Sequence, residues 1–234
     1  MSQSTRTLTN WALLVLLLLT PTLHADEVKA DPLALQVANA YGLEHWDEVM
    51  ILRYTFNTQK GDKTNARTWT WWPKEKQVTL EIEGEEPITY CRDKLDDDSP
   101  EDLRKIDHRF INDSYWLLYP FQLVWSNPAI TDEGMTELPI GDGDARKLIT
   151  QYPDEGGYTP GDAYDLYLGD DGLIAQWVFR KGGGEKGGPM TWENNVDLGP
   201  IKVCTDHHNA DKSFRLWFSD LSLTTTDGAT HEPE

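Results

Sequence analysis

The side chains best suited to chemistry gather in the run Thr205-Asp206-His207-His208. An acid beside a histidine is a pair that a hydrolase can use for acid–base catalysis, so Asp206 and His207 are the candidate catalytic residues of one hypothesis. Adjacent histidines on a strand point to opposite faces and make a poor set of metal ligands. Solvated imidazoles where a strand runs into a turn are the favoured interpretation.

Cys91 and Cys204 are the other reactive groups, each near the end of an expected strand, ITYC or IKVC. A disulfide across a sheet and two buried free thiols both remain open. The sequence has no HExxH motif and no GxSxG nucleophile elbow. Turns explain the Asp-Gly runs at 142–144 and 170–172, since neither continues into a complete calcium loop. We therefore expect no metal and no cofactor.

Aromatic residues are the strongest local signal, with ten tryptophans in the chain. In the run YWLLYPFQLVW, residues 115–125, only Gln122 is conventionally polar. One interpretation is a large aromatic core, and the other is a lipophilic cavity at the mouth of a barrel. The aromatic residues expected to bind such a ligand are Trp69, Trp71, Trp116, Tyr119, Phe121, Trp125 and Trp177.

Two arginines, Arg53 and Arg67, lie within strands rich in apolar residues. The plain interpretation is a solvent-facing charge whose stem covers apolar surface. The alternative is a buried arginine, which needs a partner because an unpaired buried charge is costly. Such an arginine would hold the carboxylate or ester of a ligand, or fasten a helix. Both residues join the candidate ligand-binding set.

The elements that must position these residues begin with a helix after Asp31-Pro32, an N-cap followed by proline at the first helical position. Alternating apolar residues then indicate some nine or ten antiparallel strands, including a hairpin around Gly169–Gly172. A second helix is expected over about 100–112. Pro120 should prevent the apolar run behind it from forming one unbroken helix.

The N-terminus has the order of a secretory signal peptide: Arg6, then an apolar run, then small residues up to Ala25. We predict a cleaved signal peptide over 1–25, one domain over 26–223 and a disordered tail over 224–234. The net charge of −19 argues against nucleic acid and anionic membranes as partners. The mature chain is expected to be periplasmic, monomeric and without a transmembrane segment.

These elements predict a mainly β (α+β) fold: a single, strongly curved antiparallel sheet forming a half-open barrel. The N-terminal helix and the inserted helical segment would cover its concave side. The run 115–125 is expected to cross this concave face as a plug, with contacts from Trp116, Leu117, Tyr119, Phe121 and Trp125. If those side chains fill the barrel they are core, and if they leave a hollow they are its wall.

Five stretches resemble an uncharacterised family of exported bacterial β-rich proteins: AYGLEHWDEVMILRYTFN, RTWTWWPK, NDSYWLLYPFQLVW, GGYTPGDAYDLYL and TDHHNADKSFRLWF. The order of elements also resembles the LolA/LolB-type periplasmic lipoprotein carriers. That resemblance implies an apolar cavity for acyl chains, although no carrier residue can be transferred onto this chain one by one.

We therefore expect a non-catalytic carrier for a lipid or another lipophilic small molecule, such as one with an acyl chain. Two alternatives stay open: a periplasmic hydrolase around Asp206 and His207, and an envelope protein-interaction module whose helical flap docks a partner.

Overall fold

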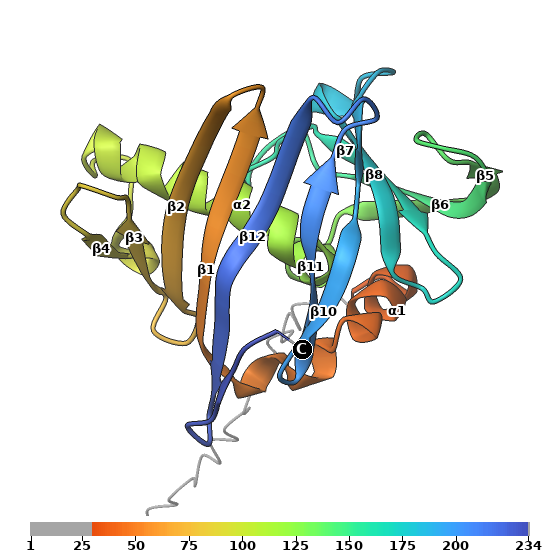
Figure 1. The fold of residues 1–234 in the computed structure, drawn as a ribbon. Coiled ribbons are helices and arrows are strands. Elements are labelled where there is room, and N and C mark those ends of the chain that lie inside the picture. The colour runs from red at the N-terminus through yellow and green to blue at the C-terminus, as the bar shows by residue number, and fades with distance from the viewer. Residues whose placement is uncertain (1–29, 234) are drawn as a thin grey trace, which may run out of the picture.

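The computed structural model describes residues 30–233, so the predicted signal peptide, residues 1–25, lies outside the described part. Two α-helices and thirteen strands make up this part, with short 3-10 turns between some of them (Figure 1). The helices are α1 (Pro32–Ala40) and α2 (Glu101–Trp125). The strands are β1 (Val49–Lys60), β2 (Lys63–Trp72), β3 (Gln77–Glu81), β4 (Ile88–Cys91), β5 (Ala129–Glu137), β6 (Asp144–Gln151), β7 (Ala163–Leu168), β8 (Ile174–Arg180), β9 (Gly188–Thr191), β10 (Glu193–Leu198), β11 (Ile201–His208), β12 (Phe214–Thr225) and β13 (Thr230–His231).

The strands form two antiparallel sheets, and the expected single curved sheet is wrong. One sheet has eight strands in the order β10-β11-β12-β1-β2-β3-β4, with β13 paired to β12. The other has five in the order β5-β6-β7-β8-β9. Neither is closed into a barrel by pairing of its edges within the described residues. The mainly β, antiparallel character and the predicted β7–β8 hairpin are confirmed.

The chain changes sheets at Trp192, the only residue between β9 and β10. Trp192 is buried, and its ring lies 4.8 Å from that of His207 in β11 and 5.2 Å from that of Trp177 in β8. One continuous alternating stretch, MTWENNVDLG, therefore serves two sheets. Alternation of apolar and polar residues indicates which face of a strand is buried, but it does not indicate which strand pairs with which. The sequence therefore suggested one sheet.

Helix α1 begins as predicted, because Asp31 accepts a hydrogen bond from the Leu33 amide at 2.7 Å and Pro32 occupies the first turn. Gly42, with a φ of 88°, follows the end of helix α1. A Cβ atom there would lie 2.6 Å from the Pro200 carbonyl oxygen, so the close approach requires glycine.

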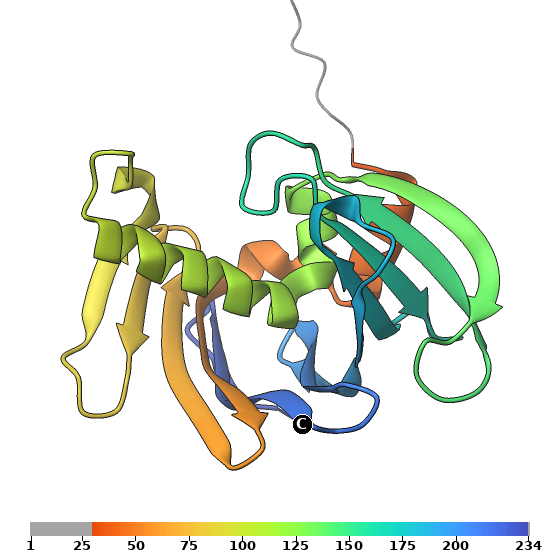
Figure 2. The same ribbon diagram turned by 90° about the horizontal axis from the view of Figure 1, so that it is seen from above.

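Helix α2 is longer than predicted, since it continues through the apolar run to Trp125 instead of ending near residue 112. The expected interruption is present: Leu118 has non-helical angles (φ −120°, ψ 19°), two residues before Pro120. Proline lacks an amide hydrogen and its ring crowds the preceding turn, so the helix bends there. Figure 2 shows α2 crossing from the eight-stranded sheet to the five-stranded one.

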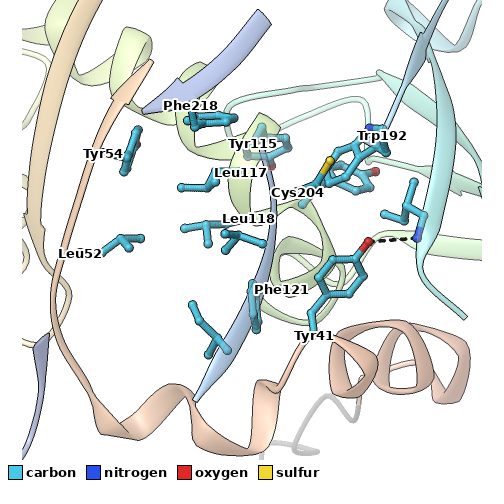
Figure 3. Close-up of a cluster of buried hydrophobic side chains, with 14 of the residues drawn as sticks. Tyr41, Leu52, Tyr54, Tyr115, Leu117, Leu118, Phe121, Trp192, Cys204 and Phe218 are labelled. Carbon is cyan, nitrogen blue, oxygen red and sulfur yellow. Dashed lines mark hydrogen bonds between the residues drawn. The ribbon is translucent and has the colours of Figure 1, made fainter. Parts of the chain in front are cut away.

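The core lies where α2 packs between the two sheets. Leu52 and Tyr54 of β1 approach Leu117, Leu118 and Phe121 of α2 in this cluster (Figure 3). The Tyr41 hydroxyl accepts a hydrogen bond from the Ile174 amide at 3.0 Å and so links the end of α1 to β8. Seven of the eleven residues of the apolar run, 115–125, are buried.

The C-terminal segment is more ordered than expected. β12 extends to Thr225, and β13 pairs with it through Leu223 and His231, so the disordered tail over 224–234 is wrong for most of its length. None of the helices in residues 30–233 is long and apolar enough to cross a membrane.

Candidate functional site

A groove with two cavities lies along α2 at the edge of the core, and it shares lining residues such as Phe110, Tyr115 and Trp177 with that core. The larger has a volume of about 410 Å³ and lies between α2, the end of β2 and the segment 152–159. Six aromatic residues contribute to its wall: Trp71, Phe110, Tyr115, Trp125, Tyr152 and Tyr158. Trp125 is 38% exposed, so this wall is open to solvent at one end.

The smaller cavity, about 230 Å³, lies on the other side of Tyr158. Trp116, Trp177 and Phe179 line it together with His108 and Asp162. Ile111, Tyr115, Tyr158 and Thr159 border both cavities, so the two adjoin across these four residues.

The segment between β6 and β7, residues 152–162, folds over α2 at this boundary and is called the strap below (Figure 2). The Tyr158 hydroxyl donates a hydrogen bond to Asp107 of α2 at 2.8 Å and accepts one from Arg92 at 2.9 Å. The base of the strap is closed by a hydrogen bond of 2.7 Å from the Gly161 amide to the Pro153 carbonyl. Tyr158 is therefore the clasp that holds the strap against the helix.

Asp107 is the centre of the clasp. It is buried and also accepts hydrogen bonds from Arg92 Nε at 2.8 Å and from the Tyr90 hydroxyl at 3.0 Å. Burial, together with the neighbouring carboxylate, raises the pKa of Tyr90 and of Tyr158. Both tyrosines thus stay protonated and donate hydrogen bonds to Asp107, which offsets the cost of burying this side chain.

Arg67, one of the candidate ligand-binding residues, fastens α2 to the eight-stranded sheet. Its Nε and Nη2 atoms lie 2.5 and 2.7 Å from the two oxygens of Asp113, which is fully buried. Trp69 Nε1 donates to the same carboxylate at 2.7 Å. Of the two roles considered for a buried arginine, the geometry supports fastening a helix.

Arg53 lies away from the groove. It pairs with Glu81 at 2.6 Å and donates to Thr70 at 2.8 Å, with both charged side chains 39% exposed. The aromatic candidates divide into two groups. Trp69, Tyr119 and Phe121 are buried in the core, whereas Trp71, Trp116 and Trp125 line the cavities. Trp177 belongs to both groups, since it lines the smaller cavity and is buried in the core.

Asp206 and His207 are neighbours in β11 that make no shared site. Asp206 is paired with Arg215. His207 is buried among rings, with Trp116 at 5.3 Å, and its Nδ1 atom donates to the Thr191 carbonyl at 3.0 Å. Burial lowers the pKa of His207 to about 4, so the imidazole is neutral. Within residues 30–233, no group of three or more His, Cys, Asp or Glu side chains is placed to hold a metal ion.

Both cysteines are free thiols, so no disulfide joins Cys91 to Cys204. Cys204 is buried in β11, and burial raises the pKa of its thiol. A protonated, inaccessible thiol is a poor nucleophile.

Sequence reasoning missed the residues that complete the groove, above all Arg92, Asp107, Tyr152 and Tyr158. The stretch PDEGGYTPGD reads as a turn-rich loop, and nothing in its spacing tells which helix it crosses. The one available signal is a lone tyrosine between glycines and prolines, a residue able to anchor such a loop.

The sequence matches no protein-family model and no curated protein. Among solved structures, the chain is similar to a DUF1329 family protein from Desulfovibrio piger, with a TM-score of 0.43 and 11% identity over 81% of this chain and 89% of that one. A LolA superfamily protein from Nitrosomonas europaea gives 0.44 and 12%, over 83% and 93% of the two chains. A domain described as an outer membrane lipoprotein-sorting protein, from Vibrio parahaemolyticus, gives 0.45 and 13%, over 83% and 92%.

These matches confirm, as a similarity of fold, the predicted resemblance to an uncharacterised β-rich family and to the lipoprotein-carrier architecture. Likenesses this distant carry no argument about a ligand or a reaction. The function must be argued from the residues of the groove.

Proposed function

We propose that this chain is an exported, non-catalytic binding protein that holds a lipophilic ligand in the groove between α2 and the strap. The observation that carries the proposal is the pair of adjoining cavities along α2, to which aromatic side chains contribute at the edge of the core. Export is inferred from the signal-peptide pattern of residues 1–25.

The size and lining of the groove support a small-molecule ligand. Volumes of about 410 and 230 Å³ together fall in the usual range for ligand pockets, which are mostly apolar with a few fixed polar groups. Trp71 and Trp125 present partly exposed rings to the larger cavity. Covering such surface is favourable by about 25 cal/mol per Å² of apolar area.

The location of the groove differs from the interior of a barrel. The space between α2 and the sheets is filled by three fully buried side chains, those of Leu117, Leu118 and Phe121. A ligand therefore lies against the outer side of α2. The hydrolase alternative gains no support, because the Asp206 carboxylate is paired with Arg215 and His207 is enclosed by rings.

Native mass spectrometry of the protein purified from the periplasm tests this proposal. We expect a mass increment that disappears after extraction with organic solvent, and restored binding of a neutral apolar dye, N-phenyl-1-naphthylamine, to the extracted protein. A protein that carries no increment and does not enhance the fluorescence of this dye would contradict the proposal.

A further inference from the structure

We infer that the ligand of the groove is a single-chain amphiphile with an anionic head group, and that Arg92 binds this head group. The inference rests on the proposed function and names the chemical class of the ligand. A fatty-acid carboxylate and the phosphate of a lysophospholipid share this chemistry.

Among residues 30–233, Arg92 is the only lysine or arginine that lines either cavity of the groove. It stands at the wall of the larger cavity, where Trp71 and Trp125 supply apolar surface. One cation beside a wall with several aromatic rings is the arrangement that suits a ligand with one charged end and one apolar chain.

The guanidinium is already held in a fixed orientation. Its Nε atom donates to Asp107 and its Nη2 atom to the Tyr158 hydroxyl. Its centre lies 5.3 Å from the Phe110 ring and 5.6 Å from the Tyr158 ring. Because the side chain is ordered before a ligand arrives, binding an acceptor costs little further side-chain entropy.

One end of the guanidinium remains available. Among the hydrogen bonds of the described residues, none uses Arg92 Nη1. A carboxylate or phosphate oxygen can accept from this atom while the contacts to Asp107 and Tyr158 persist, since a guanidinium has five N–H donors. Hydrogen bonds from an ionised donor to an ionised acceptor are stronger than neutral ones, which favours an acid over its ester or alcohol.

The other charged groups near the groove leave Arg92 as the residue that selects an anionic head group. Within the part of the chain that the structure describes, Glu155 and Asp162 are the only acidic residues lining the cavities, one in each. Asp162 also accepts a hydrogen bond from the Gly182 amide at 2.8 Å. Since the whole chain has a net charge of −19, long-range attraction does not draw anions in. Selection must therefore occur by contact at Arg92.

A titration with brominated lipids tests the inference, because bromine quenches the fluorescence of the tryptophans that line the groove. The probes are 9,10-dibromostearate and its methyl ester, added to the solvent-extracted protein. We expect the acid to bind at least about tenfold more tightly than the ester, equivalent to about 1.4 kcal/mol. In Arg92→Met this ratio should fall to near one.

Two further variants keep the test decisive. Arg92→Met leaves Asp107 buried without its cation, so Arg92→Met/Asp107→Asn removes both charges and should also lose the preference for the acid. Arg53→Met is the matched control, because Arg53 pairs with Glu81 away from the groove, and it should keep the preference.

The outcomes separate this inference from the proposed function. If acid and ester bind the wild-type protein equally well, the anionic head group is wrong while a lipophilic ligand stands. If neither probe binds, the proposed function fails as well. Competition of dibromostearate by oleoyl lysophosphatidate then tells which head group is preferred, and tighter binding of either one supports the inference.

Discussion

Asp113 shows how a single buried charge organises the surroundings of the groove. It is fully buried, and Arg67 and Trp69 direct three N–H donors at its two oxygens. Hydrogen bonds from a charged donor to a carboxylate are strong and offset the cost of burying it. The interaction fixes where α2 lies on β2, and so determines where the groove can form.

Asp113→Ala should destabilise the protein by about 3–5 kcal/mol, because it leaves the Arg67 charge and the Trp69 N–H group without their partner. Urea unfolding followed by circular dichroism measures this loss. Glu81→Ala is the control: it breaks the Arg53 pair, which is 39% exposed, and should cost no more than about 1 kcal/mol. Equal losses in the two variants would contradict the role given to Asp113.

His207 makes stability depend on pH. Burial lowers its pKa from 6.5 to about 4 in the folded state. Below about pH 6.5 the unfolded chain binds a proton that the folded chain does not, so stability falls as the pH drops from about 6.5 toward 4. The contribution lost between pH 7 and pH 5 is about 2 kcal/mol.

His207→Phe should remove this part of the pH dependence. The measurement is the free energy of unfolding in urea at pH 7 and at pH 5 for the wild type and the variant. His45→Gln, which changes an exposed histidine at the surface, should retain the wild-type dependence. An unchanged slope in His207→Phe would show that His207 does not titrate in this range.

At the level of elements, the strap is the part of the groove best suited to move. It is joined to α2 through the Tyr158 clasp, and Gly156 and Gly157 give it two left-handed positions at φ 80° and 67°. Its contacts are polar and partly exposed, so its opening should cost far less than global unfolding. Release of the clasp would connect the two cavities along the groove.

Tyr158→Phe should loosen the strap without changing its shape, because only the hydroxyl that contacts Asp107 and Arg92 is lost. At about 1 kcal/mol for such a partly exposed interaction, the amides of residues 153–161 should exchange with deuterium about fivefold faster. Dissociation of bound dibromostearate should also accelerate. Tyr167→Phe in β7, which lines neither cavity, should change neither rate.

At the scale of the whole molecule, α2 separates two environments. The core of both sheets packs against one side of this helix, and the groove lies at the edge of that core, where Tyr115 and Trp177 belong to both. Ligand binding can therefore be altered separately from core stability at groove residues that lie outside the core. Gln122 belongs to the groove side and lines the larger cavity. Arg109 lies on the exposed surface of the same helix and lines neither cavity.

Gln122→Trp should fill part of the larger cavity and weaken dye binding by about tenfold. The thermal stability of the ligand-free protein should change little, because the new ring occupies the cavity and leaves the packing of the core unchanged. Arg109→Trp adds the same side chain outside the groove and should bind the dye as the wild type does. Undiminished binding in Gln122→Trp would place the ligand elsewhere.

The sequence by itself determined the local structure of this protein. The cap at Asp31, the alternation in β1 and β12 and the break caused by Pro120 all follow from short-range rules of backbone and side-chain geometry. The resemblance to the lipoprotein-carrier architecture could also be predicted, because it depends on the order of elements. Four of the predicted aromatic residues, Trp71, Trp116, Trp125 and Trp177, do line the cavities.

Only the tertiary structure decided which faces of the helices and strands pack against one another. Alternation in MTWENNVDLG cannot reveal that the chain leaves one sheet and enters another at Trp192. An aromatic run such as YWLLYPFQLVW contains no sign of which rings meet the core and which meet a groove. That division arises because α2 lies between two sheets on one side and a strap on the other. The strap meets α2 through Tyr158 and Asp107, which lie 51 residues apart in the chain.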